Sequence, residues 1–247
     1  MCGILALYFK SDLGPEKLRV DFEMLVDSMK HRGPDGKGIF KESNVLMGNR
    51  RLAIIDLTKE AGQPMRSADG RFVLIFNGEI YNYRELGGAP EFEGVSFRTQ
   101  SDTEILLESF VKMGPNALHR FNGMFAFAIW DRKEQSLFVA RDRFGIKPLY
   151  YYENETLIAF SSEIKAILPL VEKLEPNDEI VYDFLAFGRV DHLDKTFFRG
   201  IHRFPAGCYG IVGRSGLRII RWYDISQEVL KIKAEKEFRN RDTISHV

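Results

Sequence analysis

Cysteine is scarce in this 247-residue sequence, which holds only Cys2 and Cys208. Two thiols in a chain of this length do not form the disulfide framework of small secreted domains, so we expect a reducing, cytoplasmic location. The five histidines (31, 119, 192, 202 and 246) lack the spacing of a metal site with either cysteine, and no metal is expected.

An excess charge of one sign is also missing, because 35 Lys and Arg balance 35 Asp and Glu. The sequence therefore lacks the excess of basic residues that is typical of proteins that bind nucleic acid or an anionic membrane surface. The apolar run 3–9 ends at Lys10 and Asp12 and has no basic segment before it, so it is too short and wrongly flanked for a membrane span or a signal peptide. The expected partner is therefore a small molecule or another protein.

What the sequence does contain is the material of an ordinary globular domain, with 45% hydrophobic and 28% charged residues. Apolar runs predict a strand at 3–9 covered on both faces, short strands at 45–47 and 52–55, and a buried strand at 70–76. Helical spacing predicts helices at about 15–31, 79–86, 101–111, 162–168 and 177–187. Later runs at 124–130, 135–140, 148–152 and 156–160 predict an antiparallel meander, followed by a hairpin of 208–212 with 217–220. We expect two sheets with helices outside in one domain, 1–224, and a charged tail or linker remnant at 225–247.

The N-terminal Met1-Cys2-Gly3 has a small residue after the initiator, so Met1 is expected to be trimmed. The α-amine of the new terminus titrates near ~8 and a free thiol near ~8.5, so the amine of Cys2 can accept the proton of its own thiol. Taken alone, Cys2 is better explained as a small apolar residue at the start of a strand, since cysteine is often buried.

Three further positions carry chemistry but also have ordinary structural explanations. Asn77-Gly78 is a common hairpin turn, yet the helical look of 79–86 favours a strand-to-helix corner, where an amide and an N–H form a suitable oxyanion donor pair. Arg51 follows another arginine, and such pairs are usually solvated. Asp102 lies in a first helical turn after Ser101, with Glu104 completing a capping box, where an acidic residue is favoured anyway.

Taken in order, the sequence blocks resemble the class II glutamine amidotransferase domain, an N-terminal-nucleophile hydrolase, of the glutamine-hydrolysing asparagine synthetase family. The resemblance runs from residue 1 to about 224 and is carried by Met1-Cys-Gly3, His31-Arg-Gly-Pro-Asp-Gly36, Arg51-Leu-Ala-Ile-Ile-Asp56, Gln63-Pro-Met65, Asn77-Gly-Glu-Ile-Tyr-Asn82, Ser101-Asp-Thr-Glu104, Gly123 to Asp131, Arg141 to Tyr150, Ser161 to Ala166 and Phe204-Pro-Ala-Gly207.

The resemblance implies an α+β fold, a four-layer αββα sandwich of two antiparallel sheets, with Cys2 at the end of the first strand. It also implies a site: Cys2 as nucleophile, Asn77 and Gly78 as the oxyanion pair, Arg51 on the α-carboxylate of glutamine, Asp102 with Glu79 on its ammonium, and backbone groups of Leu52, Ile54 and Ile55 along the substrate slot.

The function implied is hydrolysis of L-glutamine to glutamate and ammonia through a thioester on Cys2, supplying ammonia to an asparagine synthetase-type amidation. No cofactor is expected for this step, whereas ATP and Mg²⁺ would belong to a synthetase domain or partner. The Ser-Gly-Gly-x-Asp-Ser loop that opens such a domain does not occur here, since the Gly87-Gly88 pair is followed by Ala-Pro. We therefore expect either a glutaminase that serves a separate synthetase subunit or a truncated form of a longer enzyme.

Two other classes of function stay open at this point, as does a homo-oligomer. One is a catalytically silent glutamine-binding or regulatory subunit, against which the retained Cys2 argues. The other is an amidase acting on a different amide, against which the pairing of Arg51 with Asp102 argues, because together they fit an α-amino acid.

Overall fold

The computed structural model describes residues 1–10 and 14–233. Its strands are β1 (Gly3–Phe9), β2 (Gly36–Glu42), β3 (Val45–Arg51), β4 (Met65–Arg66), β5 (Phe72–Ile80), β6 (Gly123–Asp131), β7 (Ser136–Arg141), β8 (Tyr150–Glu153), β9 (Leu157–Ser161), β10 (Ile201–Arg203), β11 (Cys208–Gly213) and β12 (Gly216–Arg221). The α-helices are α1 (Phe22–Asp27), α2 (Tyr83–Gly87), α3 (Asp102–Met113), α4 (Ala117–Arg120) and α5 (Asp178–Phe187). Short 3-10 turns occupy Gly14–Lys17, Pro90–Phe92, Gly114–Asn116, Ile164–Ala166 and Leu168–Leu170.

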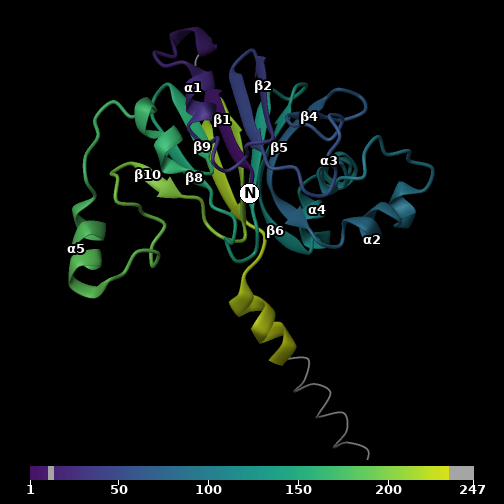
Figure 1. Ribbon diagram of the computed structural model, residues 1–247. Helices are drawn as coiled ribbons and strands as arrows, with labels where there is room; N and C mark the ends of the chain where they lie inside the picture. The colour runs from purple at the N-terminus through teal and green to yellow at the C-terminus, as the bar shows by residue number, and fades with distance from the viewer. Residues whose placement is uncertain (11–13, 234–247) are drawn as a thin grey trace, which may run out of the picture.

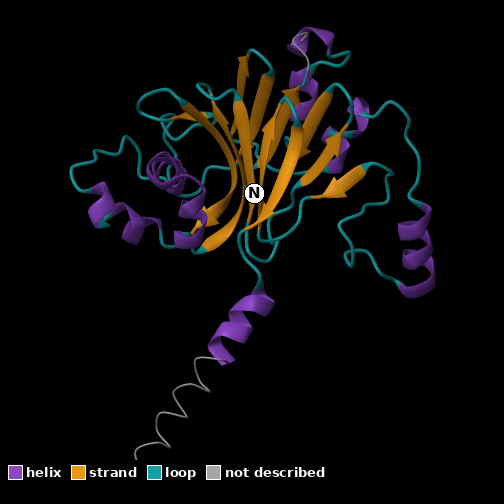
Figure 2. Cartoon of the chain, turned by 180° about the vertical axis from the view of Figure 1, so that it is seen from behind, coloured by secondary structure: helices purple, strands orange, loops and turns teal. Residues whose placement is uncertain are grey.

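Within the described residues, the strands form two six-stranded sheets that face each other (Figures 1 and 2). The strand order is β10-β8-β9-β1-β3-β2 in the first sheet and β12-β11-β7-β6-β5-β4 in the second. The paired strands run antiparallel throughout. The N-terminal strand β1 lies inside the first sheet, between β9 and β3.

Three apolar clusters divide the molecule into four layers. The central cluster lies between the sheets and takes alternate residues of each, such as Ile4, Ala6 and Tyr8 of β1. The other faces are covered by helices: α1 packs on the first sheet, whereas α3 and α4 pack on the second. All seven residues of β1 are buried, as expected for a strand covered on both faces. The predicted αββα arrangement of two antiparallel sheets is confirmed.

Several predicted elements were wrong in detail. The residues 52–55 form a loop rather than a strand, because β3 runs on through Asn49 to Arg51. The predicted strand 70–76 begins at Phe72 and continues to Ile80, so the helix expected at 79–86 is only the short α2. The predicted meander is split, because β6 and β7 belong to the second sheet and β8 and β9 to the first. The strand β2 (Gly36–Glu42) was not predicted from the sequence.

The predicted start of α3 is confirmed, since Ser101 is its N-cap and its Oγ accepts a hydrogen bond from the N–H of Glu104 at 3.4 Å. The Glu104 carboxylate does not return that bond, because it accepts from the N–H groups of Arg98 and Thr99 instead.

The residues 225–233 form a helix that projects away from the sheets (Figure 1). The rest of the predicted tail, 234–247, lies outside the described residues, so its assignment as a tail or linker stays a prediction. Among the described helices, none has the length and apolar character needed to cross a membrane.

Candidate active site

The site lies where three strands leave the core between the two sheets. Side chains on a strand alternate between faces, so every second residue continues the same face. Cys2 stands one step of two before the core residue Ile4 of β1. Asn77 stands one such step beyond Ile75 of β5, and Arg51 stands two steps beyond Met47 of β3. The alternation that builds the apolar core therefore places these polar side chains together at its open end.

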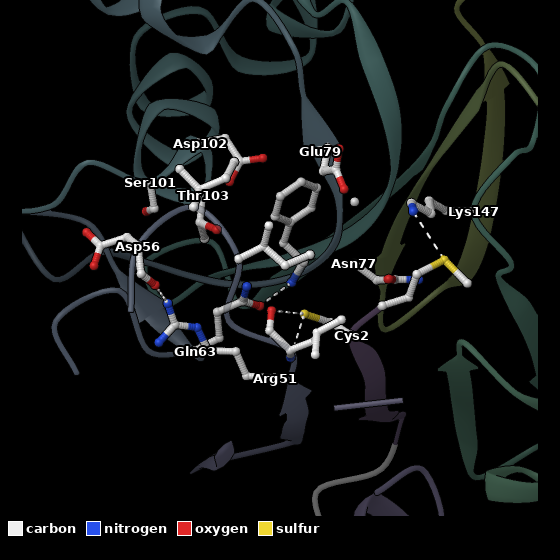
Figure 3. Close-up of a pocket in the computed structure, with 16 residues that line it drawn as sticks. Cys2, Arg51, Asp56, Gln63, Asn77, Glu79, Ser101, Asp102, Thr103 and Lys147 are labelled. Carbon is white, nitrogen blue, oxygen red and sulfur yellow. Dashed lines mark hydrogen bonds between the residues drawn. The ribbon is translucent and has the colours of Figure 1, made fainter. Parts of the chain in front are cut away.

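All nine residues expected to form the site line one pocket (Figure 3). They are Cys2, Arg51, Leu52, Ile54, Ile55, Asn77, Gly78, Glu79 and Asp102. The same pocket is also lined by Met1, Asp56, Gln63, Phe76, Ser101, Thr103 and Lys147. The structure thus brings the whole predicted set together, while the role of each residue stays a prediction.

The Cys2 side chain is held against the chain segment that follows β3. The Leu52 N–H donates to Cys2 Sγ at 3.4 Å, and the thiol lies 3.7 Å from the Leu52 carbonyl oxygen. Burial raises the pKa of the Cys2 thiol above its usual value, although the Leu52 N–H, the N-terminal amine and Arg51 oppose this effect. The resting group is therefore a thiol, which needs a base when it attacks. The carbonyl of Cys2 accepts a hydrogen bond from Arg32 Nε at 2.9 Å, which fixes its backbone.

The Asn77 side chain is fully buried, and neither its Oδ1 nor its Nδ2 has a hydrogen-bond partner among the described residues. A buried amide without partners costs free energy, so its place in the pocket calls for a ligand that it can bind. Gly78 follows, and an added Cβ would lie 2.4 Å from the carbonyl oxygen of Met124. Only glycine allows β5 to pass this close to β6. The pair lies inside β5, not at the predicted strand-to-helix corner.

Asp102 is 5% exposed at the first position of α3, and its Oδ2 accepts a hydrogen bond from the Ile80 N–H at 3.0 Å. Burial is the main cause that raises the pKa of its carboxyl group to about 6, and the nearby charge of Glu79 adds to the rise, while the hydrogen bonds from Ile80 and Thr103 oppose it. A buried carboxylate of this kind is poorly solvated and gains from a cation placed in the pocket.

The Arg51 guanidinium is held by the loop that follows β3. It donates to the carbonyl oxygen of Thr58 at 2.9 Å and to that of Asp56. The carboxylate of Asp56 in turn ties this loop together, because it accepts from Thr58 and from the N–H of Gln100 at 2.9 Å. The hydrogen bonds from Thr58 and Gln100 hold the pKa of Asp56 below its usual value. The orientation of Arg51 thus depends on an ionised Asp56.

Three pocket residues were missed as site residues by the sequence analysis. Gln63 joins the sheets, since its Oε1 accepts from the N–H of Phe76 at 2.6 Å and from Asn49 Nδ2 at 3.1 Å. Asp56 supports the loop around Arg51. Lys147 is 3% exposed although lysine is almost never buried without a partner. All three lie inside blocks that carry the resemblance, but nothing in those blocks assigns them a role, because most of their contacts are with segments distant in the sequence.

The fold and the pocket together define a class II glutamine amidotransferase domain, in which the second residue of the chain supplies a pocket thiol. Residues 1–223 match the family described as the glutamine amidotransferase domain, and the chain belongs to that family. Among curated relatives, it is 40% identical over 191 residues to the glutamine-hydrolysing asparagine synthetase 1 of Bacillus subtilis, covering 76% of this chain and 30% of the relative. The identity is 35% over 233 residues to asparagine synthetase 3 of the same organism, covering 92% of this chain and 37% of the relative. The chain therefore spans about a third of the length of these relatives.

Two solved structures share the fold at 20% sequence identity. One is the glutamine phosphoribosylpyrophosphate amidotransferase from Bacillus subtilis in complex with ADP and GMP, with a TM-score of 0.64. The other is described as the allosteric regulatory enzyme of purine biosynthesis, with a TM-score of 0.66. Each likeness covers 90% of this chain and 49% of the other.

Proposed function

We propose that this chain hydrolyses L-glutamine to glutamate and ammonia, and that the ammonia serves an asparagine synthetase-type amidation on another domain or subunit. The unpartnered amide of Asn77 carries this proposal. It is buried in the pocket that holds the Cys2 thiol, so it can stabilise negative charge on an oxygen at the reacting carbon.

The proposed reaction begins when Cys2 Sγ attacks the side-chain amide carbon of glutamine, and the α-amine of Cys2 takes the thiol proton. The tetrahedral oxyanion receives hydrogen bonds from the Asn77 amide and the Gly78 N–H. The protonated amine then gives its proton to the departing ammonia, which leaves a γ-glutamyl thioester. Water attacks this thioester and releases glutamate, which restores the thiol. Thiol and amine supply the nucleophile and the base, so the proposed step needs no cofactor.

The substrate would be held by its α-amino acid groups. The Arg51 guanidinium presents a planar fork that matches a carboxylate, and the buried Asp102 carboxylate matches an ammonium. Their location in one pocket favours an α-amino acid over a simple amide.

The mechanism requires removal of Met1, because the nitrogen of Cys2 is a peptide amide while Met1 is attached. The Met1 side chain lines the same pocket, so its removal also enlarges the space for glutamine. We place the reaction in the cytoplasm, since the proposed nucleophile must stay reduced and both cysteines are free thiols.

The test is glutamate release from L-glutamine by the chain, with the N-terminus verified by intact mass. We expect turnover by the trimmed wild type and none by Cys2→Ala. Cys208→Ala serves as the matched control, because the buried Cys208 belongs to the core and not to the pocket. Glutamine binding without turnover by the trimmed wild type would instead support a silent regulatory module, and equal activity on an amide without an α-carboxylate would support a different amidase.

A further inference from the structure

Lys147 is a buried cation in the pocket, and the proposed reaction gives it no role. Its side chain is 3% exposed, and within the described residues the hydrogen-bonding partner of its Nζ is Met1 Sδ at 3.2 Å. Figure 3 shows Lys147 on the Asn77 side of the pocket, on the side of Cys2 away from Arg51. Burying a lysine in this way without a carboxylate contact lowers the stability of the folded state, so its position needs an explanation other than stability.

The loop that carries Lys147 is built to hold it there. The Asp142 carboxylate accepts hydrogen bonds from the N–H groups of Phe144, Ile146 and Lys147 at 2.9–3.1 Å. The buried Arg141 donates to the carbonyl oxygens of Lys147 at 2.8 Å and of Gly145 at 2.7 Å. The backbone of Lys147 is therefore fixed on both of its polar groups, and its side chain is presented to the pocket.

The charged groups around the N-terminus come from four segments. Burial is the main cause that lowers the pKa of the Met1 α-amine, and the positive charges of Arg32 and Lys147 lower it further, while Cys2 and Glu79 oppose them. Burial likewise lowers the pKa of Lys147, an effect that Glu79, Asp142 and Cys2 oppose and Arg32 reinforces. Arg32 is already engaged with the carbonyl of Cys2 and with Glu163. Of these two cations, Lys147 is the one whose side chain contacts Met1, the residue that is expected to be removed.

We propose that Lys147 is a positioning residue for the α-amine of trimmed Cys2: as a protonated amine across the pocket, it keeps the α-amine in its neutral, proton-accepting form. This inference rests on the proposed glutaminase function of the same site. Once Met1 is gone, its sulfur no longer lies against Lys147, and the new α-amine becomes the N-terminal group in this pocket.

The physical reason is repulsion between like charges in a poorly solvated site. A cation near an amine disfavours the protonated amine and lowers its pKa, so more of the base is ready at neutral pH. After the amine has taken the thiol proton, the same repulsion makes the ammonium a stronger acid toward departing ammonia. Lys147 would therefore assist both proton transfers without touching the substrate.

The test compares Lys147→Met, which keeps length but removes charge, with Lys147→Arg, which keeps charge. Lys133→Met is the surface control, since Lys133 lies in the exposed turn between β6 and β7. The pKa of the α-amine is measured in the trimmed chain, carrying Cys2→Ala, from the pH dependence of its acetylation by acetic anhydride, read by mass spectrometry of the N-terminal peptide. The pH profile of kcat/KM for glutamine is measured in parallel with Cys2 intact.

We expect Lys147→Met to raise the α-amine pKa by about one unit and to shift the acid limb of the kcat/KM profile to higher pH by the same amount. On the acid side of that limb, kcat/KM should fall by about tenfold. Lys147→Arg and Lys133→Met should keep the wild-type profile. Unchanged amine titration in Lys147→Met, or a change confined to KM, would overturn the proposal. Lys147→Gln provides a second neutral side chain should Lys147→Met fail to fold. Because the acetylation assay needs no turnover, it tests Lys147 even where the wild type proves inactive.

Discussion

Replacing Asp102 by Asn should make the folded protein more stable at neutral pH while it removes the group proposed to bind the substrate ammonium. The carboxyl group is 5% exposed and its pKa is raised by burial to about 6, against an ordinary value of 3.8. The folded state therefore holds this proton up to about pH 6, whereas the unfolded chain releases it near 3.8. Between these values the folded state binds more protons, so the free energy of unfolding falls as pH rises.

The size of the effect follows from the two pKa values. A rise from 3.8 to about 6 corresponds to about 3 kcal/mol, which the wild type loses progressively between about pH 4 and pH 6. Asparagine does not titrate, and its Oδ1 can still accept the hydrogen bond from the Ile80 N–H. The stability of Asp102→Asn relative to wild type should therefore climb by about 3 kcal/mol from pH 4 to pH 7.

Urea unfolding followed by circular dichroism at half-unit steps from pH 4 to pH 7.5 measures this difference. Asp56→Asn is the matched control with the opposite sign, because hydrogen bonds from Thr58 and Gln100 lower the pKa of Asp56. The stabilisation from Asp56 is present above its unfolded pKa and is lost only as pH falls below about 4. The unfolding free energy of Asp56→Asn should therefore lie below that of the wild type by a constant amount from pH 5 to pH 7. A flat difference for Asp102→Asn over the same range would refute the argument that burial holds a proton on Asp102.

Three further predictions concern the proposed reaction and the close approach of β5 to β6. Asn77→Ala should lower kcat about 100- to 1,000-fold with little change in KM, because it removes one donor to the oxyanion; steady-state kinetics would contradict this if KM alone changed. Gly78→Ala should lower the unfolding free energy by about 1–3 kcal/mol in urea, since its Cβ would lie 2.4 Å from a backbone oxygen, whereas Gly213→Ala, with no atom within 4 Å, should not. Arg51→Lys should raise KM for glutamine more than it lowers kcat, because lysine lacks the planar fork, and equal KM values would exclude a carboxylate contact.

The sequence predicted the layers well, because the patterns that set them are local. The run 3–9 is apolar at every position, which requires a strand with two covered faces, and β1 is buried throughout. The helix cap at Ser101 was likewise predictable, because it depends only on residues close to it in the sequence. The predicted strand boundaries failed where a polar side chain is buried inside a strand: the predicted strands stopped before Asn49 and Asn77, yet both residues lie inside long strands.

The pocket itself could be predicted only through the resemblance, since its residues come from distant segments. Lys147 shows why the residues alone did not suffice. A single lysine in a turn is normally solvated, and here its burial depends on Asp142, Arg141 and the N-terminus of a different strand. Asp56 and Gln63 are similar cases, because their roles consist of hydrogen bonds across sheets and loops.

The position of β1 explains why the proposed chemistry depends on the N-terminus. Chain ends usually fray, but the start of β1 is paired with β3 through Gly3 and Arg50 and is tied by the Ile4 backbone to Ser162. The first residues are therefore fixed at the centre of a sheet, directly beside the unpartnered Asn77. Any residue placed before Cys2 must extend into the pocket, as Met1 does, and must also remove the amine. In the proposed mechanism, removal of Met1 would therefore open the pocket to the substrate and create the base in one event.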